Sequence, residues 1–275
     1  MMMGASREAL AAARERLDAL VDNTGVDVAA LAGELASVTA LLDREVSLRR
    51  VLTDPAQAGE AKAGLAGRLL TGQVGGECVD LVSGMVRSRW SASRDLVDAV
   101  EQLADTTDLV AAERQGTLDS VEDELFRFGR IVATSPELRG ALGAKDDSPA
   151  AKAARSELVH RLLGGRAQDV TERLVVRLVE NPRGRSLEAG LEALSALAAE
   201  RRGRSVAMVT SAVPLTDAQR QRLGDVLARL YGRPVQLNLD VDPTVLGGIS
   251  VRIGDEVING TVSDRLDEVV RRMAG

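Results

Sequence analysis

Few side chains in this sequence are of the types that carry out covalent chemistry or hold a metal ion. The chain contains one cysteine, Cys78, and one histidine, His160. A single thiol excludes an intrachain disulfide and a cysteine-based zinc cluster, and a single imidazole excludes a site built on two histidines. A thiol close to Gly75 and Gly76, near a helix start, could have a lowered pKa, but no second Cys or nearby His supports it as a nucleophile. We interpret Cys78 as buried packing and His160 as a helix-surface or packing residue.

The remaining candidate motifs also fall short of a catalytic or nucleotide-binding site. Neither Gly164-Gly165-Arg166 nor Gly247-Gly248-Ile249 has the Lys-Ser/Thr pair of a phosphate-binding loop, and neither fits Gly-x-Gly-x-x-Gly. Asp240 and Asp242 lie on one face of an expected strand, where we interpret them as solvated charges and not as paired catalytic carboxylates. The sequence therefore predicts no catalytic residue, no cofactor site and no metal site.

The composition is that of a globular protein without membrane-spanning helices. The sequence has 275 residues, 45% of them apolar and 1% aromatic, with 35 Lys+Arg against 41 Asp+Glu and a net charge of −6. This length is enough for one large domain or for two to three small ones. No run of about 18 apolar residues is present, and the first residues lack the apolar segment of a signal peptide, so we expect a cytoplasmic location.

The charge pattern argues against nucleic acid as the main partner, because the balance is acidic. The basic cluster Arg201-Arg202-Gly203-Arg204 is short and has no aromatic residues beside it, so we interpret it as a linker or a contact with an acidic partner. Trp90 could anchor a protein partner, since tryptophan is common at interface hot spots, but packing in the core is the favoured interpretation.

The sequence before residue 205 repeats itself. Glu34-Leu35 is matched by Glu124-Leu125, which lies 90 residues later, and further matches follow in the same order. They are Leu48–Leu52 with Leu138–Leu142, Arg68–Gly72 with Arg161–Gly165, and Leu96–Leu103 with Leu187–Leu194. The alternative is that all helices rich in Leu, Ala and Arg look alike, but the conserved order favours duplication.

Each copy has the spacing of amphipathic helices and the residues that begin and end them. Short side-chain oxygens before a proline predict an N-cap followed by the first helical residue, and glycines predict helix ends. The expected signals are Asp54-Pro55 with Gln57 as a capping box, Ser148-Pro149, Gly72 and Gly165.

Between the copies, apolar residues from Leu96 to Val132 follow steps of three and four with no proline. This spacing predicts a single helix over about 93–134, capped by Ser93, that joins two bundles. Its polar middle is expected to be exposed or paired, and the alternative is a break near Gly116.

The spacing of apolar residues changes after Arg204, where short segments of alternating apolar and polar residues, typical of strands, replace long helical patterns. We expect strands at 205–211, 235–241 and 249–253, a helix opened by the capping box of Thr216 and Gln219, a hairpin turn at Gly254-Asp255 leading to Val257 and Ile258, and a closing helix from Ser263. The fold class is therefore mainly α, with two tandem helical bundles joined by a long helix and followed by a small α+β module. The predicted domains are 1–104, 105–204 and 205–275.

The C-terminal module resembles the delta subunit of F-type ATP synthases, whose mitochondrial counterpart is the oligomycin-sensitivity-conferring protein. The resemblance is closest over 205–275 and extends over 124–204. The residues that carry it include Pro214, Leu215, Val245, Gly247, Gly248, Gly254, Asp255, Ile258, Asn259, Gly260, Arg265 and Leu266. Asn259 stands where the family usually has Asp, and the extra helical copy is similar to the longer delta subunits of actinobacteria.

The resemblance implies a non-catalytic stator subunit with no cofactor. In that family the helical domain binds the N-terminal helix of an alpha subunit on the catalytic head, and the C-terminal module binds the C-terminal end of the b helices. The implied location is the cytoplasmic face of the cell membrane, held there only through the complex. The implied role of the signature residues is fold and partner contact, and the glycines at 247 and 248 are expected to allow a tight turn.

Two other functional classes remain open from the residues alone. One is a generic helical adaptor that binds partner helices through apolar anchors spaced at i, i+3 and i+4. The other is an enzyme with a site around Cys78 or His160.

Overall fold

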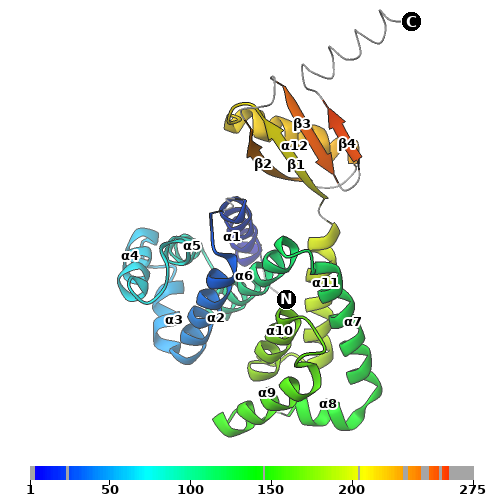
Figure 1. Ribbon diagram of the computed structural model, residues 1–275. Helices are drawn as coiled ribbons and strands as arrows, with labels where there is room; N and C mark the ends of the chain where they lie inside the picture. Colours follow the sequence, from blue (N-terminus) through cyan, green and yellow to red (C-terminus); the bar gives the residue numbers. More distant parts are fainter. Residues whose placement is uncertain are drawn as a thin grey trace, which may run out of the picture. The chain divides into compact units, whose positions relative to one another are not determined.

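The computed structural model describes residues 4–22, 25–144, 146–203, 205–231, 235–242, 248–253 and 256–259. In these residues the fold is mainly α, with twelve helices and four strands (Figure 1). The chain divides into two compact units, Met1–Arg201 and Arg202–Gly275. The mainly α class with a small strand-containing C-terminal part is therefore confirmed.

The first unit consists of helices alone in its described residues. They are α1 (Gly4–Val21), α2 (Val28–Arg44), α3 (Val46–Thr53), α4 (Gly59–Leu70), α5 (Gly76–Arg87), α6 (Ser93–Arg114), α7 (Leu118–Thr134), α8 (Pro136–Leu142), α9 (Pro149–Leu163), α10 (Asp169–Glu180) and α11 (Leu187–Gly203).

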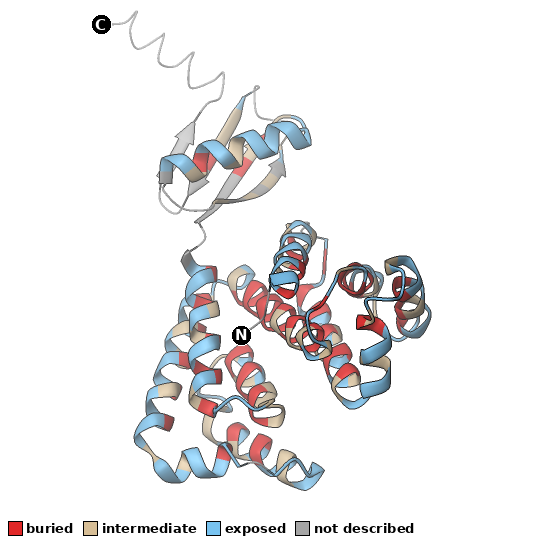
Figure 2. Cartoon of the chain, turned by 180° about the vertical axis from the view of Figure 1, so that it is seen from behind, coloured by how far each residue is buried: buried red, intermediate tan, exposed pale blue. Residues whose placement is uncertain are grey.

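Two hydrophobic cores share one helix in this unit. The first core is built by α1 to α6 and the second by α6 to α11. Leu103 of α6 belongs to the first core and Leu109, less than two turns later, to the second. Fifteen of the 22 residues of α6 are buried (Figure 2). The boundary that we placed between residues 104 and 105 falls inside this shared helix.

Each of the two bundles has an equivalent helix-capping hydrogen bond from a glutamate side chain. Gly75 and Gln168 are the N-caps of α5 and α10, and neither caps its helix with its own side chain. Instead, Glu34 Oε1 accepts a hydrogen bond from the Gly75 N–H at 2.9 Å, and Glu124 Oε2 accepts one from the Gln168 N–H at 2.9 Å. Glu34 and Glu124 are the residues paired by the sequence repeat, so this common bond supports the duplication.

The expected continuous helix over 93–134 is wrong, and the alternative of a break near Gly116 is confirmed. Gly116 has φ 71°, in the left-handed region where a side chain is strained. Two hydrogen bonds close the end of α6: the Thr117 N–H donates to the Ala112 carbonyl at 2.8 Å, and the Gly116 N–H donates to the Glu113 carbonyl at 3.0 Å. This pair of bonds is a Schellman motif, which satisfies the last carbonyls and stops the helix.

The helix start predicted at Asp54-Pro55 is also wrong. Asp54 is the C-cap of α3, and α4 begins only at Gly59. The Asp54 side chain instead accepts the Ala56 N–H at 2.9 Å and holds a turn. Ser93 is the first residue of α6 and its N-cap is Ala92, so the expected Ser93 cap is wrong by one position.

The other predicted helix signals in this unit are confirmed. Ser148 Oγ accepts the Ala151 N–H at 3.2 Å, and Pro149 is the first residue of α9. Gly72 and Gly165 lie just beyond the ends of α4 and α9, both with positive φ.

In its described residues, the second unit is a four-stranded sheet with one helix against it. Its elements are β1 (Ser205–Ser211), α12 (Asp217–Tyr231), β2 (Val235–Val241), β3 (Ile249–Ile253) and β4 (Glu256–Asn259). The strand order is β2-β1-β3-β4, with β1 parallel to β2 and the other pairs antiparallel. A small core forms where Leu227 of α12 packs with Val209 and Val251.

The capping box that opens α12 is confirmed. The Gln219 N–H donates to Thr216 Oγ1 at 3.3 Å, and the Thr216 N–H donates to Gln219 Oε1 at 2.9 Å. Ile253 and Glu256 are paired across β3 and β4 as the predicted hairpin requires, while its turn residues Gly254 and Asp255 and the expected helix from Ser263 lie outside the described residues.

The capping role of Glu124 in the second bundle can be tested by mutation. Glu124→Ala leaves the Gln168 N–H and the Thr171 hydroxyl without an acceptor that both now use, so the free energy of unfolding should fall by about 1–2 kcal/mol. Urea denaturation of the full chain followed by circular dichroism measures this loss. The control is Glu15→Ala, an exposed position in α1, which should change the free energy by less than about 0.5 kcal/mol. Equal effects of the two changes would contradict the capping role.

Candidate partner-binding pocket

The predicted signature residues do not form one site among the described residues. Pro214 is exposed in the connection between β1 and α12, and Leu215 is half-buried against the sheet core. Gly248 is exposed with φ 95°, which favours glycine. Ile258 and Asn259 pair with Val251 and Ser250 in the sheet backbone. The others, Val245, Gly247, Gly254, Asp255, Gly260, Arg265 and Leu266, lie outside the described residues.

Cys78 and His160, the two residues considered for an enzyme site, lie in surroundings that explain them as parts of the fold. Cys78 is fully buried, and its burial, together with the nearby Glu34 carboxylate, raises the pKa of the thiol to about 12. This is opposite to the lowering that an exposed helix start would produce. His160 is half-exposed and its Nδ1 contacts the Glu172 carboxylate. No group of three potential metal-ligating side chains is found among the residues that the structure describes.

Trp90 and Arg201 are both part of the fold. The buried Trp90 indole N–H donates to the Met85 carbonyl at 2.9 Å, which confirms the core interpretation. Arg201 is 3% exposed, and it binds Glu113 of α6 at 2.6 Å and Asp18 of α1 at 3.2 Å. The acidic contact of the basic cluster is therefore made within the chain, at Arg201.

The most unusual feature of the first unit is a buried row of acids on α6. Glu101, Asp105 and Asp108 are spaced at i, i+4 and i+7, so they lie on one face of the helix, and all three are buried. Arg177 of α10 contacts Asp105 through Nη1 and Asp108 through Nη2, the latter at 2.7 Å. Arg173, one turn earlier in α10, binds Asp108 at 2.8 Å. These charge-assisted contacts, in which Arg177 bridges two carboxylates, hold α6 against α10.

A tight loop between α10 and α11 adds two more arginines. Arg183 has φ 48° and Gly184 φ 77°, so the backbone makes two consecutive left-handed steps. This bend brings the Arg185 guanidinium to 2.8 Å and that of Arg183 to 3.3 Å from Glu101 Oε2. Arg183 also lies 3.7 Å from the carboxylate of Asp43 on α2, which ties the second bundle to the first.

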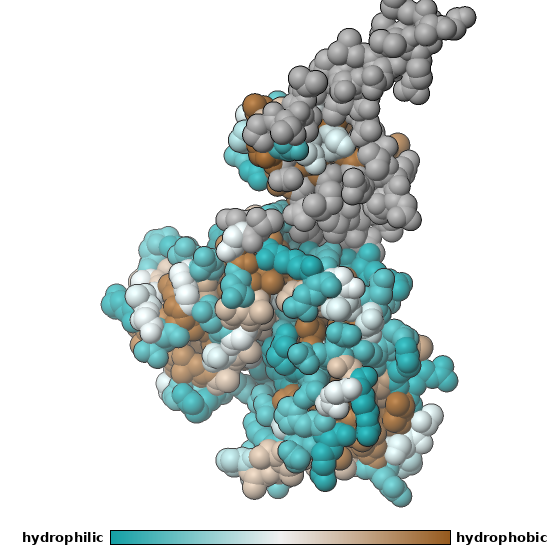
Figure 3. All heavy atoms as spheres, viewed as in Figure 1, coloured by the Kyte–Doolittle hydropathy of each residue, from teal (hydrophilic) through white to brown (hydrophobic). Residues whose placement is uncertain are grey.

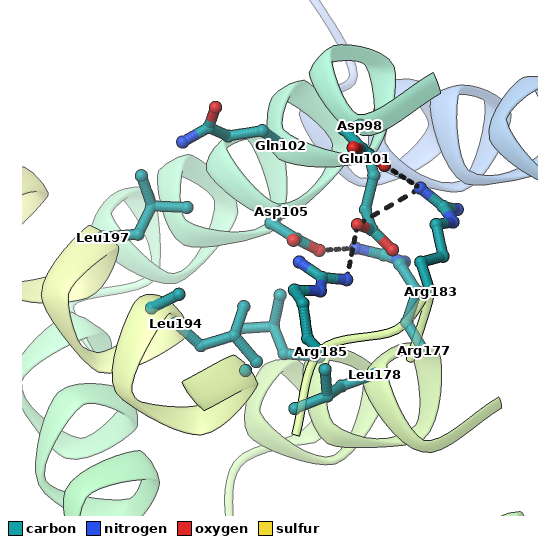
Figure 4. Close-up of a pocket in the computed structure, with 13 residues that line it drawn as sticks. Asp98, Glu101, Gln102, Asp105, Arg177, Leu178, Arg183, Arg185, Leu194 and Leu197 are labelled. Atoms are coloured by element: carbon teal, nitrogen blue, oxygen red, sulfur yellow. Dashed lines mark hydrogen bonds and ion pairs between the residues drawn. The ribbon is translucent and has the colours of Figure 1, made fainter. Parts of the chain in front are cut away.

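A pocket of about 220 Å³ opens beside this network, between α6, α10 and α11 (Figure 4). One wall is polar, with Asp98, Glu101, Gln102 and Asp105 from α6. The other wall is largely apolar, and it is formed by Leu174, Leu178, Gly190, Ala193, Leu194 and Leu197. Arg177, Arg183 and Arg185 also line the pocket, next to the acids of α6. A Cβ at Gly190 would overlap the Leu178 side chain, so glycine allows α11 to approach α10 closely.

This pocket differs from the exposed apolar positions of the first unit. On the face seen in Figure 3, hydrophilic residues cover most of the first unit and hydrophobic ones form smaller patches between them. Large exposed apolar side chains such as Phe126 and Ile131 stand on the outside of α7. The pocket instead places leucines opposite buried carboxylates, an arrangement that suits an amphipathic partner helix.

Sequence reasoning missed this site although one signal was present. The polar middle of the 93–134 segment was expected to be exposed or paired, and pairing is what the structure has at Asp105 and Asp108. The arginine partners come from α10 and the following loop, more than 60 residues later, and no local pattern links them to α6.

The raised pKa of Asp105 makes the stability of this unit depend on pH. Burial raises the pKa from 3.8 to about 7, against the attraction of Arg177, and the charges of Glu101 and Asp108 add to the rise. Between these two values the folded state binds more protons than the unfolded chain. The free energy of unfolding therefore decreases as the pH rises, by at most about 1.4 kcal/mol per pH unit from this group.

Asp105→Asn removes this contribution, so its stability relative to wild type should improve as the pH is raised from about 5 to about 8. Urea denaturation of both proteins at the two pH values measures the change. A difference that is the same at both pH values would contradict the assignment.

None of the described helices is both long and apolar enough to cross a membrane. Residues 109–273 match the family model described as ATP synthase delta (OSCP) subunit. This range contains α7 to α11 and the sheet, but the α6 wall of the pocket, Asp98 to Asp105, lies before it.

Proteins of similar length match the whole chain. ATP synthase subunit delta of Streptomyces griseus subsp. griseus is 73% identical over 274 residues and covers 100% of both chains. The proteins of the same name from Streptomyces avermitilis and Thermobifida fusca are 73% and 47% identical, with at least 98% of each chain covered. Most of the first bundle lies before residue 109, outside the family model, and is thus shared with these relatives. The chain belongs to the ATP synthase delta (OSCP) subunit family.

Proposed function

We propose that this chain holds the catalytic head of an F-type ATP synthase to the C-terminal ends of the b subunits, and that its second helical bundle binds the N-terminal helix of an alpha subunit. Family membership makes the chain a non-catalytic component of the peripheral stalk, which favours the stator over a generic adaptor or an enzyme. The full-length similarity to delta subunits is the observation that carries this proposal. The site of action that follows is the cytoplasmic face of the cell membrane, reached through the complex.

The pocket supports the second bundle as the binding site of the alpha helix. Its apolar wall contains Leu178, Leu194 and Leu197 on two adjacent helices. Leu178 and Leu194 belong to the buried core, whereas Leu197 is partly exposed, so apolar anchors of an amphipathic helix at i, i+3 and i+4 would pack at the edge of this core. Each buried Leu or Val anchor contributes about 1.5–3 kcal/mol before ordering costs. A few such anchors give the tight complex that a stator under torque requires.

In the first bundle, an arginine of another helix covers the position that corresponds to Arg177. The N-caps of α5 and α10 are 93 residues apart, so Gly84 of α5 corresponds to Arg177 of α10. The Arg16 guanidinium of α1 lies over Gly84, in the space that a Cβ there would occupy. This contrast favours the second bundle, and we keep the division into two helical copies and a C-terminal module as part of the proposal.

A bulky side chain at the mouth of the pocket tests the proposed binding site. Ala193 is exposed and lines the pocket, so Ala193→Trp should block it without disturbing the core. Its affinity for a synthetic peptide of the N-terminus of the alpha subunit from the same organism should fall by about tenfold or more, by loss of one or two anchors. Isothermal titration calorimetry on the full chain measures this.

The matched control is Ala196→Trp, an exposed position on the same helix that does not line the pocket. It should bind the peptide as wild type does. Equal affinities for wild type and Ala193→Trp would place the alpha helix elsewhere.

The division of labour between the two units makes a second prediction. A chain of residues 1–204 keeps both helical cores and loses the sheet. It should still bind the catalytic head, because the pocket is intact, but it should no longer retain the b subunits. Pull-down from solubilised membranes with the full chain as reference measures both contacts. Retention of b by the shortened chain would show that the helical unit makes the stalk contact.

A further inference from the structure

One carboxylate oxygen in the pocket has no hydrogen-bond partner. Glu101 is 3% exposed, and its Oε2 accepts a hydrogen bond from Arg185 and forms an ion pair with Arg183. Its Oε1 is buried and has no donor among the residues that the structure describes. Figure 4 shows this carboxylate in the pocket wall, between the two guanidinium groups. A buried charged oxygen without a donor is costly, so a donor supplied by a ligand would be favourable here.

The charge of α6 favours a cationic donor. This helix carries Asp95, Asp98, Glu101, Asp105, Asp108 and Glu113 against Arg94 and Arg114. Arg177, Arg183 and Arg185 line the pocket opposite these acids, so a cationic ligand would have to replace one of their contacts. Asp98 and Gln102 lie beside Glu101 in the pocket wall, and the Asp98 side chain is 38% exposed. A lysine or arginine entering the pocket would therefore meet the exposed carboxylate of Asp98 first. It would reach the buried carboxylate of Glu101 only when the Arg185 guanidinium moves aside. Charge-assisted hydrogen bonds of this kind are about twice as strong as neutral ones.

Arg185 holds the same carboxylate from the solvent side. Its side chain is 38% exposed, whereas Arg183 is 3% exposed and is shared with Asp43 and Asp98. Of the two guanidinium groups on Glu101, that of Arg185 is thus the one able to leave without breaking the ties between the bundles.

We propose that Glu101, with Asp98 at the entrance, forms a subsite for one lysine or arginine of the bound partner helix, and that Arg185 competes with this cation in the free protein. The apolar residues of the same helix lie on Leu178, Leu194 and Leu197. This inference rests on the proposed function, because the partner is the alpha N-terminal helix. It adds a charge requirement that an apolar groove alone would not impose.

The test is a peptide series titrated calorimetrically into the full chain. The parent is the N-terminal peptide of the alpha subunit from the same organism, and each variant replaces one Lys or Arg by norleucine, which keeps an aliphatic stem and removes the charge. One replacement should weaken binding by about tenfold, the loss of one charge-assisted hydrogen bond, and the others should have little effect.

Variants of the protein test whether Glu101 causes the loss of peptide affinity seen with the sensitive norleucine replacement. In Glu101→Gln the sensitive replacement should change the affinity by less than about twofold, because the charge partner is already gone. Arg185→Gln should bind the parent peptide several-fold more tightly than wild type, since the competing guanidinium is absent; a purely structural role of Arg185 would not raise affinity. The matched control is Glu113→Gln, which removes an arginine-paired carboxylate of α6 outside the pocket and should leave the norleucine effect unchanged.

These experiments distinguish a failure of the cation subsite from a failure of the proposed function. If the parent peptide binds but no norleucine replacement weakens it, or if the sensitive replacement is equally weak in Glu101→Gln, the cation subsite is wrong and the proposed function stands. If the parent peptide does not bind to the full chain, the proposed function and this subsite are both wrong. Should Glu101→Gln fail to fold, Arg185→Gln decides: unchanged or lower affinity overturns the competition and with it the subsite.

Discussion

The first unit depends on a single constraint, which is that α6 must serve two hydrophobic cores while carrying a row of buried acids. Glu101, Asp105 and Asp108 cannot be left uncompensated in this position, so the second bundle must place Arg177 and Arg183 against them. Because breaking one partner of a buried pair costs far more than the pair contributes, this network favours one arrangement of α10 and its following loop over other apolar packings.

This constraint suits a subunit that transmits force without catalysing a reaction. A helix shared by two cores gives the bundles no free hinge between them, and Arg183 and Arg201 tie it further to α2, α11 and α1. The same packing creates the pocket, since Gly190 brings α11 onto α10 while the acids keep α6 at the polar side. The same set of contacts therefore provides both rigidity and the partner-binding pocket. Cys78 is packed in the core and His160 lies on the surface, and neither role involves a chemical reaction.

Local sequence signals predicted the fold where the deciding contact is local. Ser148 and Thr216 are caps because their oxygens bond amides three residues away. The helix start predicted at Asp54 was wrong because an Asp side chain can also stabilise a turn. The helix end at Gly116 depends on backbone hydrogen bonds, which the spacing of apolar residues does not reveal. The pocket was not predictable in this way, because the pairing of α6 with Arg177 joins residues far apart in the sequence and depends on tertiary packing.

We propose that the pocket between α6, α10 and α11 binds the catalytic head. A photo-crosslinking amino acid placed at residue 193, in enzyme assembled in membrane vesicles, tests this contact in the intact complex. We expect a crosslink to the N-terminal segment of an alpha subunit, and none from the same group placed at residue 16 of the first bundle. A crosslink to alpha from residue 16 alone would contradict it.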